Sequence, residues 1–312
     1  MMPIKLSNIH NKLPVIDLFI SAISFEERSL SLINTLDDNH VRKIWFAYNH
    51  NEKEFYLDKL ILAETKNNSE LIEFSTDNPI ITAQTLANKF NSLTKLENVL
   101  IDITTFTHEG LLILYKFLDL YRYKISNLYL AYIGAKEYSV NESEDDNKWL
   151  SKGTKTIRSV LGYPGILNPS NKNHLIILFG FESERTAQLI ENFEFDKVSI
   201  GIGPENDSIK TNHYNINRKR HIDMLKQYPF AETFEFSLTD PLSTKIQIEN
   251  QIKKYEGYNI VITPLNNKLS TIGTALVAID NSKVQLCYLR AHEYNYRGYS
   301  IPSDDCYIIK IY

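Results

Sequence analysis

Two short polar stretches, each directly after an apolar run, carry residue types that could bind a ligand or act on it. Residues 24–28 have the sequence Ser-Phe-Glu-Glu-Arg, and residues 180–185 have the sequence Gly-Phe-Glu-Ser-Glu-Arg. A glutamate can act as a general base or bind Mg²⁺, and an arginine beside it can hold an anionic group. These stretches supply the ligand-binding candidates Ser24, Glu26, Arg28, Glu182 and Arg185. The structural alternative is an acidic helix start whose arginine is a local ion-pair partner.

A second pair of stretches differs between the two halves of the chain. Residues 102–107 have the sequence Asp-Ile-Thr-Thr-Phe-Thr, whereas residues 263–268 have the sequence Thr-Pro-Leu-Asn-Asn-Lys. A lysine near a helix N-terminus, with amides and hydroxyls around it, is suited to bind an anion. We therefore expect a ligand to contact Thr104, Thr105, Asn266, Asn267 and Lys268. An exposed capping loop is the alternative.

A third pair of stretches ends in Glu-Tyr. Residues 135–138 have the sequence Ala-Lys-Glu-Tyr, and residues 291–294 have the sequence Ala-His-Glu-Tyr. Tyrosines near arginines can stack on a base, so His292, Glu293 and Tyr294 are further ligand-binding candidates. In a chain with 19 tyrosines, a purely structural aromatic cluster is the alternative.

Carboxylates at these positions would be the catalytic groups if the chain is an enzyme. The catalytic candidates are Glu182, Glu184 and Asp102, as general bases or Mg²⁺ ligands. Whether the chain is an enzyme stays open at this point. No resident cofactor and no metal site are predicted, and Mg²⁺ is expected only for an enzyme.

Several common sites are excluded by the sequence. A dinucleotide site needs Gly-x-Gly-x-x-Gly after the first strand, because the main chain must approach a pyrophosphate, and here glutamates occupy that turn. The motifs of P-loop nucleoside triphosphatases, zinc metalloproteases and serine hydrolases do not occur either. With only Cys287 and Cys306, cysteine cannot build a disulfide framework or a four-cysteine zinc site.

The composition is that of a globular protein of about two domains. The chain has 312 residues, of which 43% are hydrophobic and 23% charged, so wholesale disorder is excluded. The net charge of −4 argues against direct binding to nucleic acid or to an anionic membrane. The first residues lack a secretion-signal pattern, and no apolar run has the length of a membrane span. We expect a soluble, cytoplasmic protein.

The polar stretches belong to a longer internal repeat. Four segments of the first half recur in the same order in the second half, each about 160 residues later. The matched segments are 19–29 with 177–186, 74–79 with 236–241, 98–102 with 259–263, and 130–138 with 286–294. Four ordered matches at a nearly constant offset indicate a tandem duplication. Two unrelated α/β domains with similar strand endings are the alternative.

Apolar runs rich in β-branched residues alternate with helical patterns in each copy, so the fold class is α/β. We predict a tandem duplication of a Rossmann-like, mostly parallel sheet flanked by helices, each copy with an appended edge strand. Each copy ends in a tail, residues 143–162 in the first and 300–312 in the second, and the predicted edge strands are the alternating runs 155–160 and 306–312 within these tails. The predicted domains are residues 1–162 and 174–312, joined by a turn-rich linker over residues 163–173.

Ligands of open parallel sheets bind outside the carboxyl ends of the strands, where all of these candidates fall. We therefore expect a protein that binds a nucleotide-type or other polar anionic ligand there, as a sensor or regulatory component. The layout is similar to that of the fused sensor domains of bacterial immune systems that bind cyclic oligonucleotides, a similarity of topology without a shared residue motif. It implies a role in antiviral defence, and the Asn-, Lys- and Ile-rich composition favours a bacterial source.

Two alternatives remain open. One is a hydrolase or transferase of nucleotides or nucleosides that uses the carboxylates at the strand ends. The other is a non-catalytic subunit whose surface binds a protein partner encoded nearby in the genome.

Overall fold

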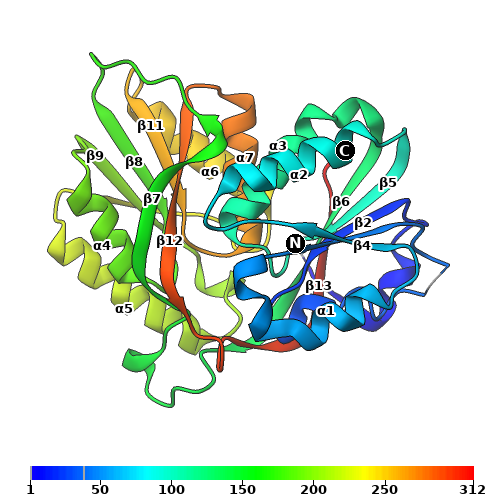
Figure 1. Cartoon of the computed structure of the whole chain (residues 1–312). Helices are drawn as coiled ribbons and strands as arrows, with labels where there is room; N and C mark the ends of the chain where they lie inside the picture. Colours follow the sequence, from blue (N-terminus) through cyan, green and yellow to red (C-terminus); the bar gives the residue numbers. More distant parts are fainter. Residues whose placement is uncertain (1, 38) are drawn as a thin grey trace. The chain divides into compact units, whose positions relative to one another are not determined.

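The computed structural model describes residues 2–37 and 39–312, which form two compact units. Unit 1 comprises Met1–Glu137 and Ser300–Tyr312, and unit 2 comprises Tyr138–Tyr299. Each unit contains one sheet with helices on both of its faces (Figure 1).

Unit 1 has a seven-stranded sheet in the order β1-β13-β6-β5-β2-β3-β4. These strands are β1 (Ile4–Lys5), β2 (Leu18–Ala22), β3 (Ile44–Tyr48), β4 (Ser69–Glu73), β5 (Leu96–Asp102), β6 (Ile125–Tyr138) and β13 (Ser300–Lys310). The α-helices are α1 (Leu57–Glu64), α2 (Pro79–Asn91) and α3 (His108–Leu120). The 3-10 helices are η1 (Leu6–Asn11), η2 (Glu27–Leu30), η3 (His50–Tyr56) and η4 (Arg122–Lys124). Helices α2 and α3 lie on one face of the sheet and α1 on the other (Figure 1).

Unit 2 has a six-stranded sheet in the order β10-β9-β8-β11-β12-β7. These strands are β7 (Ser151–Pro164), β8 (Asn173–Leu178), β9 (Lys197–Ile202), β10 (Glu232–Glu235), β11 (Asn259–Pro264) and β12 (Val284–Tyr294). The α-helices are α4 (Ser183–Asn192), α5 (Thr211–Gln227), α6 (Pro241–Lys254) and α7 (Lys268–Asp280). Two 3-10 helices are η5 (Asp145–Asn147) and η6 (Glu205–Asp207). Helices α4 and α5 lie on one face of the sheet and α6 and α7 on the other (Figure 1).

The two sheets share one strand order, which confirms the predicted fold class. If the five parallel strands of each copy are numbered in chain order, their order across the sheet is 3-2-1-4-5. The strands are β4-β3-β2-β5-β6 in unit 1 and β10-β9-β8-β11-β12 in unit 2. The order reverses between the first and fourth strands, at β2 and β5 in unit 1 and at β8 and β11 in unit 2. The carboxyl ends of these strands are the switch points at which such sheets bind ligands.

The appended strands are exchanged between the two copies. Strand β7 follows the first copy in the sequence but pairs antiparallel with β12 of the second, and β13 lies beside β6 of the first copy. The structure therefore divides the chain differently from the predicted domains 1–162 and 174–312, and the predicted linker 163–173 lies inside unit 2. The alternating pattern that indicated an edge strand does not specify which sheet it completes, because the pattern is the same for either partner.

Local sequence signals explain where the helices begin. Helices α2 and α6 start with a proline at a first helical position, where its missing N–H costs nothing. Asn78 caps α2 by accepting a hydrogen bond from Ile80 N, and Asp240 caps α6 by accepting one from Leu242 N. The central strands β2, β8 and β11 are buried nearly throughout, as expected for parallel strands covered on both faces.

Candidate functional site

In unit 1 the first predicted turn forms a buried ion pair. Arg28 donates from Nε and Nη2 to Glu26 Oε2, at 2.9 and 2.5 Å, and both side chains are almost completely buried. Arg28 Nη1 donates to the main-chain oxygen of Ile133 on β6 at 2.9 Å. Ser300, the first residue of β13, donates from Oγ to the same Glu26 oxygen at 2.9 Å. The pair thus joins the turn after β2 to both β6 and β13.

The turn after β5 is also bonded internally. Asp102 Oδ1 accepts hydrogen bonds from the main-chain nitrogen of Thr104, at 3.0 Å, and from its hydroxyl. Thr104 Oγ1 in turn accepts from Ile133 N at 3.0 Å. Burial raises the pKa of Asp102 to about 6, while the Thr104 bonds and Arg28 oppose that rise. The side chains of Asp102 and Thr104 are both buried at the carboxyl edge of the sheet.

Unit 2 repeats the arrangement with different partners. Arg185 donates from Nη2 to the main-chain oxygen of Leu289 on β12, the counterpart of Ile133 in the sequence repeat, and from Nη1 to Ser151 Oγ at 3.1 Å. Glu182 Oε1 accepts from the main-chain nitrogen of Ser151 at 3.0 Å. Burial raises the pKa of Glu182, opposed by Arg185 and by the Ser151 bond. Ser151 begins β7, as Ser300 begins β13, so each appended strand is held at its first residue.

Glu184 is placed apart from these buried groups. Its side chain is exposed on α4, and one carboxylate oxygen accepts from the main-chain nitrogen of Gly153 at 3.4 Å. Asp102 belongs to unit 1 and Glu182 to unit 2. Within the parts of the chain described, no group of three His, Cys, Asp or Glu side chains has the arrangement of a metal site.

Side chains bridge the switch point in both units. Thr105 Oγ1 donates to the main-chain oxygen of Ala22 at 2.6 Å, and Asn266 Nδ2 donates to that of Phe179 at 2.5 Å. These bonds tie the turn after the fourth strand to the end of the first strand. Ser24, also predicted to bind a ligand, accepts a hydrogen bond from Glu26 N at 3.2 Å. A ligand at either switch point would have to displace such a bond.

In unit 2 the main chain itself occupies the crevice. A Cβ added to Gly180 would collide with the main-chain oxygen of Leu265, so the two turns are in direct contact. Asn267 caps α7 by accepting from Ser270 N at 2.9 Å, and its amide donates to Leu238 O at 2.7 Å. Lys268 is half-buried as the first residue of α7. The glycine therefore allows close packing of this chain's own turns.

The third candidate set lies at the end of β12. His292 and Glu293 are exposed, and Tyr294 is half-buried. The Tyr294 ring packs edge-on against Tyr296 with centroids 6.2 Å apart, and its hydroxyl is 3.5 Å from that of Tyr288. Glu293 and Tyr294 also pair in register with Lys152 and Ser151 of β7. The structure thus places these residues at a strand pairing.

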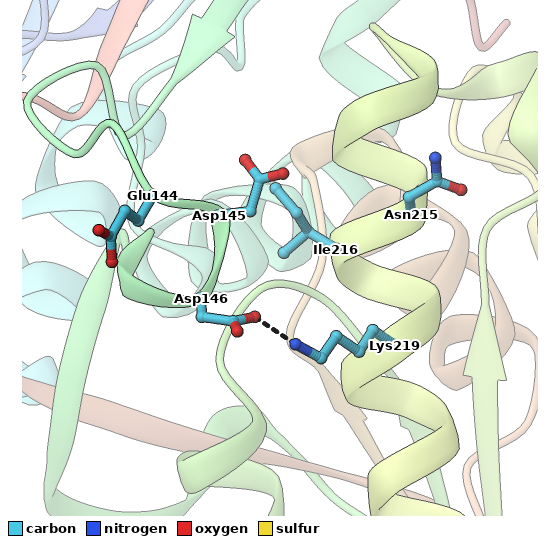
Figure 2. Close-up of a pocket in the computed structure, with 6 residues that line it drawn as sticks. All are labelled: Glu144, Asp145, Asp146, Asn215, Ile216 and Lys219. Atoms are coloured by element: carbon cyan, nitrogen blue, oxygen red, sulfur yellow. Dashed lines mark hydrogen bonds and ion pairs between the residues drawn. The ribbon is translucent and has the colours of Figure 1, made fainter.

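An open pocket of about 500 Å³ lies in unit 2 between the loop that carries η5 and helix α5 (Figure 2). The residues that line it are Glu144, Asp145, Asp146, Asn215, Ile216 and Lys219. Lys219 Nζ pairs with Asp146 Oδ1 at 2.5 Å, and Asn212 donates to Asp145 Oδ1 at 3.0 Å. Figure 2 shows the carboxylate of Glu144 pointing away from α5. None of the predicted site residues lines this pocket.

Sequence reasoning missed an apolar surface on helix α1. Leu57, Ile61 and Leu62 are 54%, 55% and 55% exposed, although residues of this type are usually buried. The sequence of α1, Leu-Asp-Lys-Leu-Ile-Leu-Ala-Glu, does indicate this surface, because it has more apolar residues than a single buried stripe of a helix requires. We refer to Leu57, Ile61 and Leu62 as the α1 face.

None of the helices in residues 2–37 and 39–312 has both the length and the apolar character needed to cross a bilayer. No protein-family model matches the chain, and no curated protein matches it either.

Among solved structures, the chain is similar to phosphoethanolamine N-methyltransferase 1 of Haemonchus contortus in complex with phosphoethanolamine and S-adenosylhomocysteine. The TM-score is 0.26 and the identity 6%, over 86% of this chain and 75% of that chain. It is also similar to a PLP-bound threonine synthase from Brucella melitensis, with a TM-score of 0.20 and 11% identity, over 91% of this chain and 61% of that chain. Similarities with such low TM-scores and identities assign no family and no activity to the chain. Its fold class follows from its own strand order.

Proposed function

We propose that this chain is a non-catalytic subunit that binds another protein through the α1 face of unit 1. The observation that carries the proposal is the exposure of Leu57, Ile61 and Leu62 on a helix whose opposite side is already buried. A surface helix normally exposes a polar face to solvent, and a helix that is apolar all round is normally covered.

Helix α1 is fixed to unit 1 by its inner side. Leu60 and Ala63 are buried in the core cluster of the unit, together with Tyr56 from η3. At 100° per residue, the outer arc of the helix carries the α1 face together with Asp58 and Glu64. Covering a half-exposed leucine or isoleucine contributes about 1 kcal/mol, so the α1 face could supply roughly 3 kcal/mol to an interface.

The charges around the α1 face indicate what kind of partner fits. The exposed charged side chains of α1 are Asp58 and Glu64, and Glu54 precedes the helix. Lys59 is turned inward, where its ammonium donates to the main-chain oxygens of Ser24, Phe25 and Glu26. An apolar surface with acidic neighbours is complementary to an amphipathic protein segment that carries basic residues. It does not favour an anionic lipid surface.

The enzyme alternative receives less support from the geometry. Its candidate bases Asp102 and Glu182 are bonded to main-chain groups of the sheet edge, and the Glu26–Arg28 pair is buried. Groups in these roles hold the fold together, and substrate would have to displace their present partners to reach them.

The test uses a double substitution, Leu57→Asn with Ile61→Asn, on the purified chain. The protein would be used to isolate a partner from its source cells, and that partner would then be purified and its affinity measured by calorimetry. We expect the double substitution to weaken the reconstituted complex at least tenfold, as for central interface residues. The control is Ile80→Asn on α2, which is 55% exposed but outside the α1 face and should leave the affinity unchanged. Equal loss in both variants, or no loss in either, would refute this function.

A polar ligand at the carboxyl edge of unit 2 is a second candidate. The observation that favours it is the half-buried Lys268 as the first residue of α7, where the helix dipole and a cation favour an anion. Nucleoside mono- and triphosphates would be added to the wild type and to Lys268→Ala while the melting temperature is measured. A rise in the wild type that the variant lacks would support the ligand site, and no rise would remove it.

A further inference from the structure

We infer that the protein partner of the α1 face adds an extended segment to unit 1 as an eighth strand, beside β4. This inference rests on the proposed function, because it names how the partner binds the same surface. Strand β4 is the last strand of its sheet, and within residues 2–37 and 39–312 it pairs with β3 alone. An edge strand of this kind is a template for main-chain hydrogen bonds with another chain.

The hydrogen bonds of β4 show which of its main-chain groups face away from β3. The oxygen of Asn68 accepts a bond from β3 at 3.1 Å, and the nitrogen of Phe74 donates one to β3 at 2.8 Å. The N–H and C=O groups of successive residues point to opposite sides of a strand, so the even-numbered residues between these two also face β3. The main-chain groups of Leu71 and Glu73 therefore face outward, at the open edge.

Helix α1 turns part of the α1 face toward this edge. Leu60 and Ala63 point into the core, and Lys59 reaches to one side, where its ammonium bonds to main-chain oxygens in the turn after β2. Strand β2 lies on the opposite side of β3 from β4. At about 100° per residue, Leu57 and Ile61 lie on the other side of α1 from Lys59, which is the side of the β4 edge.

The side chains of β4 divide between the two faces of the sheet. Leu71 is half-buried and packs against the core cluster that holds the inner side of α1. Glu70 is on the opposite face, where it pairs with Lys89 of α2. An added strand would place every second side chain on the α1 side, next to Leu71 and beneath the exposed leucine and isoleucine of α1. Apolar residues at alternate positions of the partner segment fit this surface.

The charges on the α1 side of this edge favour basic residues in the partner segment. Residues 52–73 contain six acidic residues and three lysines, of which Lys59 is turned inward. Burial raises the pKa of Tyr48, and Glu73 and Glu64 add to that rise, so both acids act on the end of β3. We therefore expect an extended segment in which apolar residues alternate with polar ones, with a lysine or arginine beside Glu73.

The first test compares two substitutions of one edge residue. Glu73→Pro removes an outward N–H but keeps the ladder to β3, because proline is tolerated where the N–H of an edge strand faces solvent. Glu73→Ala removes the same carboxylate and keeps the N–H. The affinity of each variant for the purified partner of the α1 face would be measured by calorimetry. We expect Glu73→Pro to weaken binding at least tenfold. Glu73→Ala should weaken it less than about fivefold, as for an exposed ion pair.

Amide hydrogen exchange of the wild type provides a test that needs no substitution. In the free chain, the amides of Leu71 and Glu73 should exchange quickly, whereas those of Ile72 and Phe74 should be protected by β3. Binding of the purified partner should slow exchange at Leu71 and Glu73 at least tenfold and leave the other two unchanged. A helical segment docked on α1 would not produce this alternation along β4.

A second pair of variants separates the two sides of the α1 face. Leu57 and Leu62 are 54% and 55% exposed, but Leu62 lies on the Lys59 side of α1, away from the β4 edge. We expect Leu57→Asn to weaken binding of the partner at least tenfold and Leu62→Asn to weaken it less than about threefold. Equal losses would mean that the partner covers the outer surface of α1 and not the edge.

The inference is overturned if Glu73→Pro binds the partner as tightly as Glu73→Ala, or if exchange at Leu71 and Glu73 is the same in the free and bound chain. If Leu57→Asn with Ile61→Asn still weakens the complex in that case, the partner docks on α1 without adding a strand, and the proposed function stands. If neither the α1 nor the β4 substitutions change the affinity for any isolated protein, both are refuted.

Discussion

Arg28 donates a hydrogen bond to the main-chain oxygen of Ile133, which lies 105 residues later in the sequence. Arg185 donates to the oxygen of Leu289, the residue that corresponds to Ile133 in the second copy, 104 residues later. In each unit the arginine of the first turn thus holds the fifth parallel strand. The arginine of the duplicated pattern therefore makes the same structural contact in both copies.

We predict that Arg28→Met destabilises unit 1 by about 3–5 kcal/mol, because it leaves the Glu26 carboxylate buried without its cation. The adjacent Ile133 oxygen also loses its donor. The free energy of unfolding in urea measures the change. A second variant that adds Glu26→Gln should recover part of the loss, since it removes the stranded charge.

The matched control for this prediction is Arg42→Met. Arg42 pairs with Asp17 at 2.9 Å, but its side chain is 71% exposed, so the substitution should cost no more than about 1 kcal/mol. Similar losses for Arg28→Met and Arg42→Met would contradict the structural role of the buried pair.

The sequence was sufficient to predict the strand–helix alternation and the duplication, because apolar periodicity and repeated strand endings are local properties. It was not sufficient to predict what the charged turns contact. A glutamate and an arginine two residues apart form the same pattern whether they meet a ligand or each other. Their remaining partners, Ile133 and Ser300, are 105 and 274 residues away from Arg28 and Glu26.

Residues 26–35 show the same limit. Their sequence has a helical pattern, but the structure has only the 3-10 helix η2, Glu27–Leu30, at its start. Glu26 and Arg28 are drawn inward to the buried pair, and Ser29 and Leu30 are buried as well. Tertiary contacts of these side chains thus determine the local backbone where the helical pattern alone would have favoured an α-helix.

We predict that acidification destabilises unit 2 through His174. This residue is fully buried on β8, where Nε2 is 2.8 Å from Ser199 Oγ. Burial lowers its pKa to about 4; Glu232 opposes that shift, whereas Lys254 and Lys197 add to it. The unfolded chain binds a proton near pH 6.5, whereas the folded chain does so only near pH 4. Stability is therefore lost as the pH falls from about 6.5 to about 4, by up to about 3 kcal/mol.

Urea unfolding of the wild type and of His174→Gln at pH 7 and pH 5 measures this effect. Glutamine keeps a polar group near Ser199 but does not titrate in this range. The wild type should lose more stability than the variant between the two pH values. An equal loss would assign the acid sensitivity to other groups.

We predict the opposite pH dependence for Asp102. Burial raises its pKa from 3.8 to about 6, so between these values the folded state binds a proton more tightly than the unfolded state. Its contribution to stability is present below about pH 4 and is lost as the pH rises through 6. Asp102→Asn keeps an oxygen that can accept from Thr104 N, and it should stabilise unit 1 by up to about 3 kcal/mol at pH 7. At pH 4 the wild type and the variant should have nearly the same free energy of unfolding, and a large difference there would show that the amide disturbs the turn itself.

We predict that Gly180→Ala destabilises unit 2 by more than about 2 kcal/mol, because the added methyl group would collide with the Leu265 oxygen at the switch point. The control is Gly134→Ala on β6, where the nearest atom to the added carbon is Asp305 O at an ordinary 3.5 Å and the cost should be below about 1 kcal/mol. Urea unfolding of both variants makes the comparison. If Gly180→Ala were tolerated as well as Gly134→Ala, the turns after β8 and β11 would be able to separate, and the switch point of unit 2 would be open to a ligand. A large difference between the two variants would instead assign this glycine to the contact between the chain's own turns.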